Sequence, residues 1–588
     1  MNRRKWSFDL VVCATQIGSG LLGLLILNCP AFSQTNLACT GSNGGINLPP
    51  GFCATIFADN IGHVRHMVVS PDNVLYVNNW IRDFRFKPPL HGGLLVALKD
   101  SKGTGKADVI MRFGLTQQDG SLGGSGIAFY NRAIYAEQDD KIIRFALKPG
   151  EIAPTSQPET VVSGLPVTGD HPMHTFIISA AGQIFVDVGS PSDACQEDNR
   201  KAGSPGKDHC PELETGGGTW RYDANQTDQH FSAARRYATG IRNGEGFAFD
   251  ADGQLYVTQH GRDLLSQNWP QFYKAGEGVE LPAEVIFKAE QGGDYGWPYC
   301  YFDPFQKKQV LGPEYGGDGG HKVGVCAEKK SPVAFFPAHL APNDLLIYSS
   351  KAFPTAYRGG MFIAFHGSYN RAPAPQQGYE VVFQPFAHGR TTGDYVVFAN
   401  NFAGPIMEPG RAEHRPTGLA TGPDGALYIS DDVKGRIWRV TYSGPSDAKV
   451  EGAASPTLTA DAKSKRNDGR PNTASLPVPK GATKAQIALG DRIFHGEAAS
   501  GTCAGCHGSD AKGSPKAPDL TSGIFVQSPG DFKSIIQTIT NGVAKPVNYA
   551  DPMPPLGGAA LSQSDVTAVA AYVWALSHKD MRKKHAKK

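Results

Sequence analysis

One short pattern recurs between residues 68 and 431 and constrains the fold more than any other feature. It consists of an apolar strand, a tight polar turn and an alternating strand. It occurs as VVSPDNVLYV from Val68, GIAFYNRAIYA from Gly126, IISAAGQIFVD from Ile177, FAFDADGQLYVTQ from Phe247 and LATGPDGALYISD from Leu419. Asp-Gly in the last two segments is a strong turn signal, so each segment predicts a β-hairpin.

The hairpins are spaced like the blades of a propeller. The second strand of each hairpin begins 59, 50 and 71 residues after the previous one between Leu75 and Leu255. The longer gap to Leu427 holds one more candidate unit, YRGGMFIAFHGSYN from Tyr357. Six β-sheet units at such a period are typical of a β-propeller, and a β-sandwich would not need so many copies of one hairpin. We therefore expect a mainly β chain built on a six-bladed β-propeller.

A different motif lies near the end of the chain, in GTCAGCHGSDAKG at 501–513. Cys503-Ala-Gly-Cys506-His507 is the C-x-x-C-H signature of covalent c-type haem attachment. Two thiols one helical turn apart each form a thioether to a haem vinyl group, and the histidine ligates the iron. A redox dithiol would not need the histidine, and no second C-x-x-C completes a zinc site.

A second axial ligand is available in Asp551-Pro-Met553-Pro-Pro555. The prolines fix an extended loop around Met553, and Met/His ligation of haem iron suits electron transfer. We expect a short helix over 485–494 and a terminal helix after the capping-box pattern Ser562–Asp565. This order over residues 484–578 resembles a small class I cytochrome c domain, which is all-α.

The N-terminus predicts export. A positive segment, Arg3-Arg4-Lys5, precedes a largely apolar stretch at 10–27 and small residues at 30–33. This order is typical of a secretory signal cleaved near Ser33. Polar and glycine residues interrupt the apolar stretch, and no other stretch is apolar enough to span a membrane. We expect a periplasmic protein with no stable membrane span in the mature chain.

An exported chain can contain disulfides. Ten cysteines are present, and two of them lie in the expected signal and two in the haem motif. The other six allow fifteen connectivities. Nearness in sequence suggests the pairs Cys39–Cys53, Cys195–Cys210 and Cys300–Cys326.

Composition divides the chain into segments. Residues 443–483 are rich in Pro, Ala, Ser, Lys and Asp and show almost no periodic apolar pattern, which is typical of a flexible tether. We expect a signal peptide at 1–33, the propeller at 34–442, the linker at 443–483, the cytochrome c domain at 484–578 and a basic tail at 579–588. The formal net charge is only +2, and no basic stripe favours nucleic acid.

Three segments between the hairpins carry a family resemblance. They are DHPMHTFIISAAGQIFVDVGSPSD from Asp170, YATGIRNGEGFAFDADGQLYVTQHGRD from Tyr237 and QGGDYGWPYC from Gln291. Together they resemble the soluble pyrroloquinoline-quinone (PQQ) sugar dehydrogenases. The short motifs His260–Asp263 and Asn268–Pro270 are similar to the L-sorbosone dehydrogenase branch. The resemblance covers roughly residues 48–442 and implies an enzyme that oxidises a sugar or sugar aldehyde with PQQ and calcium.

The resemblance implies roles for several residues. It makes His171 the catalytic base, with His174 as the competing candidate. It makes Arg242 and Asn243 contacts to the quinone. Arg415 matches a basic contact to a PQQ carboxylate, a task that suits a guanidinium because it can bind a carboxylate through two hydrogen bonds.

The same resemblance places calcium near Gly261 and Arg262. Their backbone carbonyls stand where the family holds the calcium ion that bridges to PQQ. Arg262 takes the place of a proline that the glucose-oxidising branch has there.

The chemistry that this family performs matches the residue types. Oxidation of a sugar hydroxyl or an aldehyde hydrate removes a proton and a hydride together. A neutral imidazole can take the proton, and a cofactor must accept the hydride because side chains cannot. Arg242 and calcium would stabilise the growing negative charge. The haem c would receive the electrons and pass them to a downstream periplasmic acceptor.

Two other functions stay open at this point. The propeller could be a calcium-dependent lactonase or hydrolase, with a haem unrelated to its chemistry. It could also be a non-catalytic docking module that delivers the cytochrome to a partner. Within the sugar dehydrogenase reading, an aldose, a sorbosone-like aldehyde and a deoxysugar are all compatible with the sequence.

Overall fold

The structure is a computed structural model of the chain. It describes residues 41–81, 90–368, 370–371, 374–407, 411–453, 472–496, 498–499, 503–508, 510–514, 517–549, 552–559 and 561–579. The expected signal peptide, Cys39, linker residues 454–471 and tail residues 580–588 lie outside the described residues. Within the part that is described, no helix has both the length and the apolarity that crossing a membrane requires.

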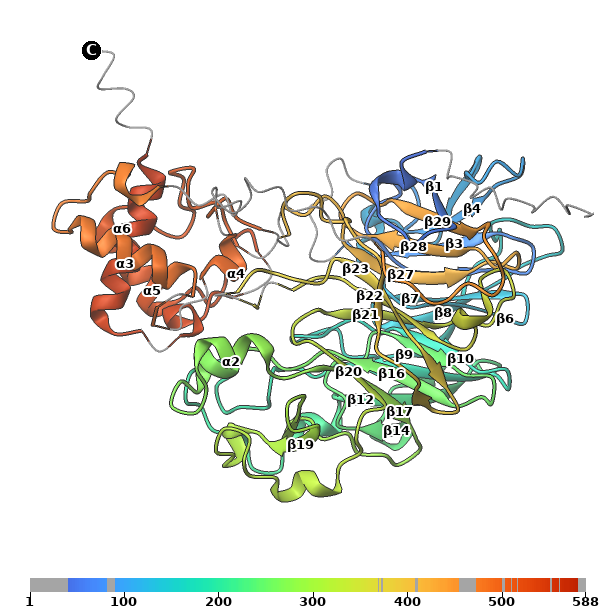
Figure 1. Cartoon of the computed structure of the whole chain (residues 1–588), viewed down its shortest axis with the longest axis horizontal. Coiled ribbons are helices and arrows are strands. Elements are labelled where there is room, and N and C mark those ends of the chain that lie inside the picture. Colours follow the sequence, from blue (N-terminus) through green and yellow to red (C-terminus); the bar gives the residue numbers. More distant parts are fainter. Residues whose placement is uncertain are drawn as a thin grey trace, which may run out of the picture. The chain divides into compact units, whose positions relative to one another are not determined.

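Six sheets of four or five strands in the described residues form the propeller that the hairpins predict (Figure 1). The first three sheets contain β2 (Val64–Val69), β3 (Leu75–Asn79), β4 (Leu95–Lys99) and β5 (Val109–Phe113); β6 (Ile127–Tyr130), β7 (Ala133–Gln138), β8 (Lys141–Ala146), β9 (Glu159–Ser163) and β13 (Gln229–His230); and β10 (Phe176–Ile178), β11 (Gln183–Val188), β12 (Gly218–Asp223) and β14 (Arg236–Thr239). The last three contain β15 (Phe247–Phe249), β16 (Leu255–Gln259), β17 (Glu284–Ala289) and β20 (Ala334–Phe336); β21 (Pro342–Ile347), β22 (Met361–Phe365), β23 (Glu380–Gln384) and β26 (Val396–Ala399); and β27 (Pro416–Thr421), β28 (Leu427–Asp431), β29 (Ile437–Tyr442) and β1 (Phe52–Ala58).

The sixth sheet closes the ring. Its outer strand β1 comes first in the chain and pairs antiparallel with β29, the last strand, from Phe52 opposite Tyr442 onward. The Phe52 ring packs edge-on against Phe353 and Phe398 of the fifth blade, with ring centres 4.8 and 4.9 Å apart. Because the two ends of the propeller share one sheet, the pairing of β1 with β29 holds the ring closed.

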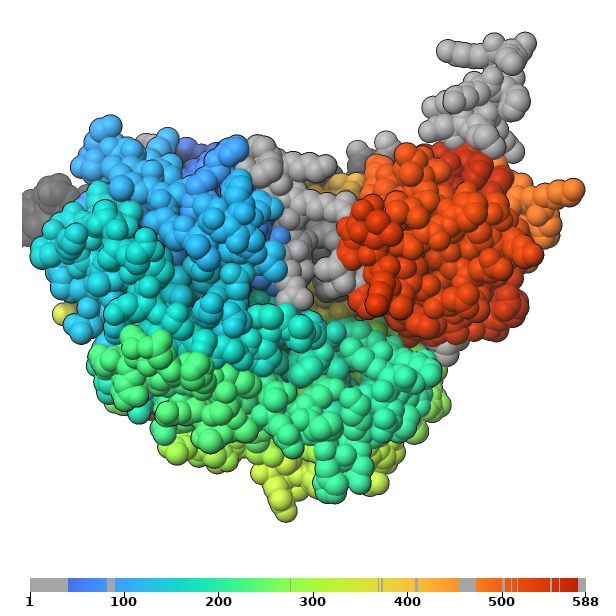
Figure 2. All heavy atoms as spheres, turned by 180° about the vertical axis from the view of Figure 1, so that it is seen from behind, coloured from blue at the N-terminus to red at the C-terminus, as the bar shows by residue number. Residues whose placement is uncertain are grey.

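Apolar clusters between neighbouring sheets hold the blades together. Trp220 lies in the cluster between the second and third sheets and Trp438 in the cluster between the fifth and sixth, and both are fully buried. Figure 2 shows consecutive blades, coloured blue through green, lying side by side. Strands inside the propeller are buried on both faces, because a neighbouring sheet packs on each side. This explains why both strands of each hairpin are rich in apolar residues.

The antiparallel blades have two distinct edges. Connections between the second and third strands of a blade, and connections from one blade to the next, lie on the same edge. We call this edge the crossover edge. Turns between the first and second strands lie on the opposite edge.

Arg65, at the start of the first blade, links four blades through its guanidinium. Its Nη2 donates to Glu245 at 2.6 Å, its Nη1 to Asp432 at 2.9 Å and its Nε to Ser125 at 3.3 Å. Arg65, Glu245 and Asp432 are all at most 3% exposed. Burial opposes the ionised form of Glu245, but the positive charge of Arg65 holds its pKa below the ordinary value.

Two further pairs of strands and two short helices lie in the long connections. They are β18 (Cys300–Asp303) with β19 (Lys308–Leu311), β24 (Phe386–Ala387) with β25 (Arg390–Thr391), α1 (Leu265–Asn268) and α2 (Ala275–Glu280). The predicted disulfides Cys195–Cys210 and Cys300–Cys326 are confirmed. Cys53 is also disulfide-bonded, and its pairing with Cys39 stays a prediction because Cys39 lies outside the described residues.

The C-terminal domain is helical, as predicted. It contains α3 (Lys484–Phe494), α4 (Cys503–His507), α5 (Phe532–Asn541) and α6 (Gln563–Ser577). Ser562 and Asp565 form the predicted capping box of α6. A Cβ atom on Gly490 of α3 would lie 2.0 Å from the Ala568 carbonyl of α6, so these two helices cross at a distance that only glycine allows.

We expect the Arg65→Met variant to lose about 3–5 kcal/mol of unfolding free energy. The change leaves the carboxylates of Glu245 and Asp432 buried without their cation. Chemical denaturation of the propeller, followed by tryptophan fluorescence, measures the loss. The control is Lys201→Met, which removes a solvent-exposed pair with Asp198 and should unfold close to the wild type. Equal stability of the Arg65→Met variant and the wild type would contradict the role given to Arg65.

Candidate functional site

The predicted propeller site residues all lie on the crossover edge. His171 lies between β9 and β10, and the pair Arg242 and Asn243 lies between β14 and β15. Gly261 and Arg262 follow β16, and Arg415 directly precedes β27. Two of the three segments that carry the family resemblance, those from Asp170 and from Tyr237, therefore contribute residues to this edge.

His171 has its ring fixed by Ser190. Its Nδ1 lies 2.9 Å from the Ser190 carbonyl oxygen and 3.0 Å from Oγ, and Oγ donates to the Ser192 carbonyl at 2.6 Å. Because a carbonyl only accepts, Nδ1 carries the proton and Nε2 keeps the lone pair. Burial, followed by the charge of Arg242, lowers the pKa of His171 to about 3. The imidazole is therefore neutral at neutral pH and able to accept a proton.

His174 lies in a different environment. It is fully buried, and both its backbone N–H and its ring Nδ1 bind Glu137 Oε1, at 2.8 and 3.1 Å. His171 is half-buried. The geometry therefore favours His171 over His174 for contact with a bound molecule.

Arg242 is the centre of a buried ionic network. Its Nη2 donates to Asp193 Oδ1 at 2.7 Å and to Asp263 Oδ2 at 3.2 Å, and its Nη1 donates to the Gly261 carbonyl at 3.0 Å. Asp263 Oδ2 also accepts a hydrogen bond from Arg200 Nη1 at 3.1 Å. Burial opposes the ionised form of Asp263, but Arg200 and Arg242 hold its pKa below the ordinary value. The network fixes the Arg242 guanidinium in one position.

The Gly261 carbonyl does not fit a calcium ligand in the observed arrangement. It accepts from Arg242, whose positive charge opposes a cation at the same oxygen. The Arg262 side chain is bound to Glu314 and lies 3.5 Å from Asp193. The calcium assignment at Gly261 and Arg262 stays a prediction.

Arg415 is held by backbone carbonyls. Its Nε donates to the His366 carbonyl at 2.9 Å and its Nη2 to the Gly367 carbonyl. Its backbone N–H donates to Asp431 at 2.7 Å, and its guanidinium lies 5.6 Å from the centre of the Tyr379 ring. Its Nη1 group donates to none of the described residues, so it is available to an anion.

Several buried polar atoms near Arg242 have no hydrogen-bond partner among the described residues, and Asn243 Oδ1 and His260 Nε2 are two of them. Buried polar atoms are normally paired, and each unpaired one calls for an explanation. A bound molecule rich in oxygen, nitrogen and carboxylate groups, such as PQQ, fits the neighbourhood of Asn243, His260 and Arg415.

The haem motif also fits its expected group. Cys503, Cys506 and His507 lie on the single turn of α4, and His507 Nδ1 lies 3.0 Å from the Pro518 carbonyl. Nδ1 therefore carries the proton, which leaves Nε2 for iron. Cys503 and Met553 pack against the same apolar core of the domain. Met553 is held there by two backbone hydrogen bonds to Val543, at 2.7 and 3.0 Å.

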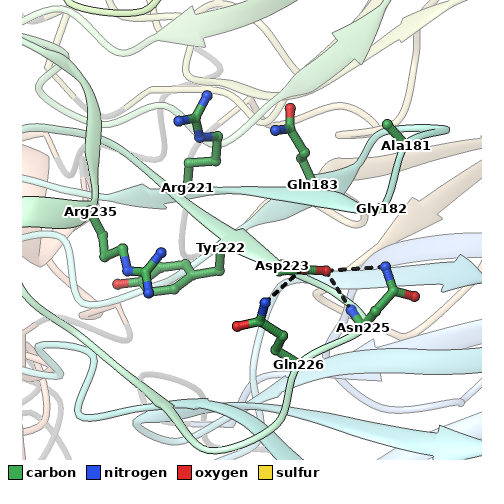
Figure 3. Close-up of a pocket in the computed structure, with 9 residues that line it drawn as sticks. All are labelled: Ala181, Gly182, Gln183, Arg221, Tyr222, Asp223, Asn225, Gln226 and Arg235. Atoms are coloured by element: carbon green, nitrogen blue, oxygen red, sulfur yellow. Dashed lines mark hydrogen bonds between the residues drawn. The ribbon is translucent and has the colours of Figure 1, made fainter.

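A separate pocket of about 350 Å³ lies on the other edge of the third blade (Figure 3). Its lining includes Gln183 at the start of β11, and Arg221 and Asp223 at the end of β12. None of the predicted site residues lines it. It belongs to the turn between the first two strands and is distinct from the crossover edge.

Sequence reasoning missed several residues of the site. Arg65, Asp193, Glu245 and Asp432 come from four different blades, and no short motif joins them. Asp263 stood inside the motif His260–Asp263 and could have been selected from it. His366 lies inside the hairpin segment that begins at Tyr357, which indicates a blade and does not single out this histidine.

Comparison with known proteins agrees with the two-part architecture. Residues 46–443 match the family described as TrAA12-like, and residues 486–573 match the family described as cytochrome C oxidase, cbb3-type, subunit III. The chain is 23% identical over 346 residues to a pyrroloquinoline quinone-dependent sugar dehydrogenase of Hypocrea jecorina, which covers 54% of this chain and 74% of that protein.

Two further curated relatives match over shorter stretches. The chain is 28% identical over 208 residues to an uncharacterized protein of Borreliella burgdorferi, which covers 35% of this chain and 48% of that protein. It is 37% identical over 91 residues to the cbb3-type cytochrome c oxidase subunit CcoP of Rubrivivax gelatinosus, which covers 16% of this chain and 26% of that subunit. The chain thus spans less than half the length of these two relatives.

Solved structures show the same propeller fold. The holo PQQ domain of pyranose dehydrogenase from Coprinopsis cinerea has a TM-score of 0.52 at 18% identity, covering 67% of this chain and 97% of that one. The calcium structure of the Trichoderma reesei family AA12 enzyme has a TM-score of 0.52 at 20% identity, covering 70% and 100%. The chain therefore belongs to the TrAA12-like family, as a sugar-dehydrogenase-like β-propeller joined to a C-terminal cytochrome c domain.

Proposed function

We propose that the chain is an exported quinoprotein that oxidises a sugar or sugar aldehyde with PQQ and passes the electrons to its own haem c. The observation that carries this proposal is the pair His171 and Arg242, a neutral imidazole beside a fixed guanidinium, on the crossover edge of the family propeller. A haem-attachment motif in the same chain supports it. The Hypocrea and Coprinopsis proteins named above support PQQ as the cofactor.

The proposed mechanism assigns the proton to His171. Its Nε2 takes the proton of the substrate hydroxyl, and Ser190 holds Nδ1–H so that Nε2 stays available. When bound, PQQ would supply the acceptor for the hydride that leaves the carbon bearing this hydroxyl. Asn243 and Arg415 would hold the cofactor, and Arg242 would stabilise negative charge at the reacting end.

Asp193 and Asp263 act through Arg242. They hold its guanidinium by hydrogen bonds at 2.7 and 3.2 Å, so the donor does not need to reorganise when charge develops. Asp193 and Asp263 are thus positioning residues in this proposal. The fixed position of the Arg242 guanidinium distinguishes it from a flexible arginine on the protein surface.

The cytochrome c domain would receive the electrons one at a time. Cys503 and Cys506 would bind the haem, and His507 and Met553 would be its axial ligands. A periplasmic acceptor downstream would then oxidise the haem. The expected signal peptide supports this location, and residues 443–483 would tether the domain to the propeller.

The lactonase or hydrolase alternative is less well supported. Such a site needs free carboxylate and amide oxygens around a metal ion. On the crossover edge, Asp193, Asp263 and Glu314 each bind an arginine instead. The docking-module alternative gives no reason for a histidine whose ring is fixed with one nitrogen available.

A direct experiment adds sugars to the haem-loaded protein without oxygen. We expect haem reduction, seen in the absorption spectrum, to require both PQQ and an oxidisable sugar or sugar aldehyde. A panel of aldoses, sorbosone-like aldehydes and deoxysugars identifies the substrate class, with added calcium as a separate arm. Absence of haem reduction with every sugar, although PQQ binds, would contradict the proposed function.

The base is tested in the same assay. His171→Ala should retain PQQ binding and slow haem reduction by about 100-fold or more, because it removes the proton acceptor. His174→Ala is the matched control, since His174 binds Glu137 inside the core. A larger loss in the control than in His171→Ala would transfer the role to His174.

We expect Met553→Ala to change the haem spectrum while leaving covalent attachment intact. The wild type should show a low-spin c-type spectrum with a weak sulfur-to-iron band at the red end when oxidised. The variant should lose that band and have a lower reduction potential, because a methionine ligand raises the potential. An unchanged band in the variant would rule Met553 out as the axial ligand.

A further inference from the structure

A second histidine on the crossover edge is held as a general base requires. His366 follows β22, and its Nε2 lies 3.0 and 2.9 Å from the two carboxylate oxygens of Asp432. An ionised carboxylate only accepts hydrogen bonds, so Nε2 carries the proton and Nδ1 keeps the lone pair. In His171 the two ring nitrogens have the opposite roles, since Nδ1 carries the proton and Nε2 keeps the lone pair.

Asp432 is a permanent anion behind this imidazole. Arg65 Nη1 donates to its carboxylate at 2.9 Å, and the residue is fully buried. Burial raises its pKa, but His366 and Arg65 outweigh burial and hold the pKa below the ordinary value. A fixed carboxylate of this kind orients an imidazole and stabilises the imidazolium that forms when the ring takes a proton.

His366 belongs to the same neighbourhood as the proposed cofactor contacts. Its backbone carbonyl accepts from Arg415 Nε at 2.9 Å. It interacts electrostatically with Glu245, which binds Asn243 Nδ2 at 3.3 Å. The side chain of His366 is 11% exposed, whereas those of Asp432 and His174 are 0% exposed. Of the three, His366 alone reaches open space.

The charges around His366 keep it neutral at rest. Burial and then Arg415 lower its pKa to about 4, although Asp432 opposes them, and Arg65 adds to the lowering. Above pH 5 the ring is therefore uncharged and can accept a proton. His63 stands behind Asp432, with its Nδ1 2.5 Å from the Asp432 carbonyl oxygen.

The proposed reaction needs two proton acceptors. Oxidation of one CH–OH group to C=O breaks an O–H and a C–H bond and releases two electrons. The two electrons would leave one at a time through the single haem, which the downstream one-electron acceptor would reoxidise between the two transfers, so two protons are left for each carbonyl formed. His171 takes the hydroxyl proton. The proton that remains from the hydride, once both electrons have left, has no acceptor in the mechanism above.

We propose that His366, backed by Asp432, accepts this second proton. The inference rests on the proposed function, because the second proton exists only when electrons pass singly to the haem. It separates the roles of the two histidines in time. His171 acts when the substrate is oxidised, and His366 acts when the electrons leave for the haem.

The variant His366→Gln tests the role, and His414→Gln is its matched control. His414 Nδ1 also lies 2.9 Å from a carboxylate, that of Asp431, but its ring packs edge-on against Trp438 in the core. In anaerobic stopped flow with a one-electron acceptor such as ferricyanide in excess, which reoxidises the haem between the two transfers, His366→Gln should slow electron flow through the haem on the order of 100-fold. Rapid quench of the same mixture should still show one carbonyl product per chain formed at the wild-type rate. His414→Gln should behave like the wild type in both measurements.

Rescue by added imidazole distinguishes a proton acceptor from a residue that only supports the structure, because free imidazole can replace the former and not the latter. It should restore haem reduction in His366→Ala and have no effect on His414→Ala. A loss of the initial product in His366→Gln would instead give His366 the role of His171. Equal slowing of the Gln variants, or no rescue of His366→Ala, would overturn the proposal.

A spectroscopic test does not depend on turnover. In protein labelled with ¹⁵N-histidine, the His366 signals, assigned by their loss in His366→Gln, should report the Nε2–H tautomer with an unprotonated ring at pH 6. They should shift when PQQ is added. A protonated ring at pH 6, or signals that PQQ leaves unchanged, would overturn the inference. A wild type that binds PQQ but never reduces its haem with sugar would instead overturn the proposed function, and the inference with it.

Discussion

The buried guanidinium of Arg65 is the interaction on which the centre of the propeller depends. It binds Glu245 and Asp432 and so joins the first blade to the fourth and the sixth. A buried ion pair of this kind adds little stability compared with an apolar core, but losing one partner is costly. Arg65 also sets the protonation states around it, because it keeps Asp432 ionised behind His366 and Glu245 ionised beside Asn243.

The same arrangement of fixed charges recurs around Arg242. Each guanidinium is shared by two carboxylates from different connections, and each stands beside a histidine that burial keeps neutral. The two histidines keep the lone pair on opposite ring nitrogens, Nε2 in His171 and Nδ1 in His366. A propeller can build such a pair because its crossover edge gathers two connections from every blade. The blades supply rigidity and the connections supply chemistry, as is usual when a function is carried by a common fold.

The sequence alone was sufficient to predict those parts of the structure that a local pattern of residues determines. The hairpin repeat predicted the propeller, the C-x-x-C-H motif and the capping box at Ser562 predicted the helical domain, and nearness predicted two disulfides. It was not sufficient where contacts join distant blades. Arg65 and Asp432 are 367 residues apart, and the pairing follows only from closure of the ring by β1 and β29. The motif at Gly261 likewise suggested a calcium ligand. The hydrogen bond that the Gly261 carbonyl accepts from Arg242 could not be predicted from that motif.

The central claim is that the propeller and the haem of one chain form a single electron path. Ala453 N–H donates to the Val397 carbonyl of the propeller, and Leu476 is buried in the core of the helical domain, which leaves residues 454–471 for the proposed tether. A flexible coil of about 18 residues would have a root-mean-square span of roughly 23 Å. Such a tether holds the haem domain at an effective concentration on the order of millimolar. The most direct measurement is the rate of sugar-driven haem reduction, followed by anaerobic stopped flow over a wide range of protein dilutions. The account predicts a rate constant that does not change with protein concentration and becomes second-order when the tether is cut. A rate constant proportional to concentration in the intact chain would contradict it and would show that electrons pass between molecules.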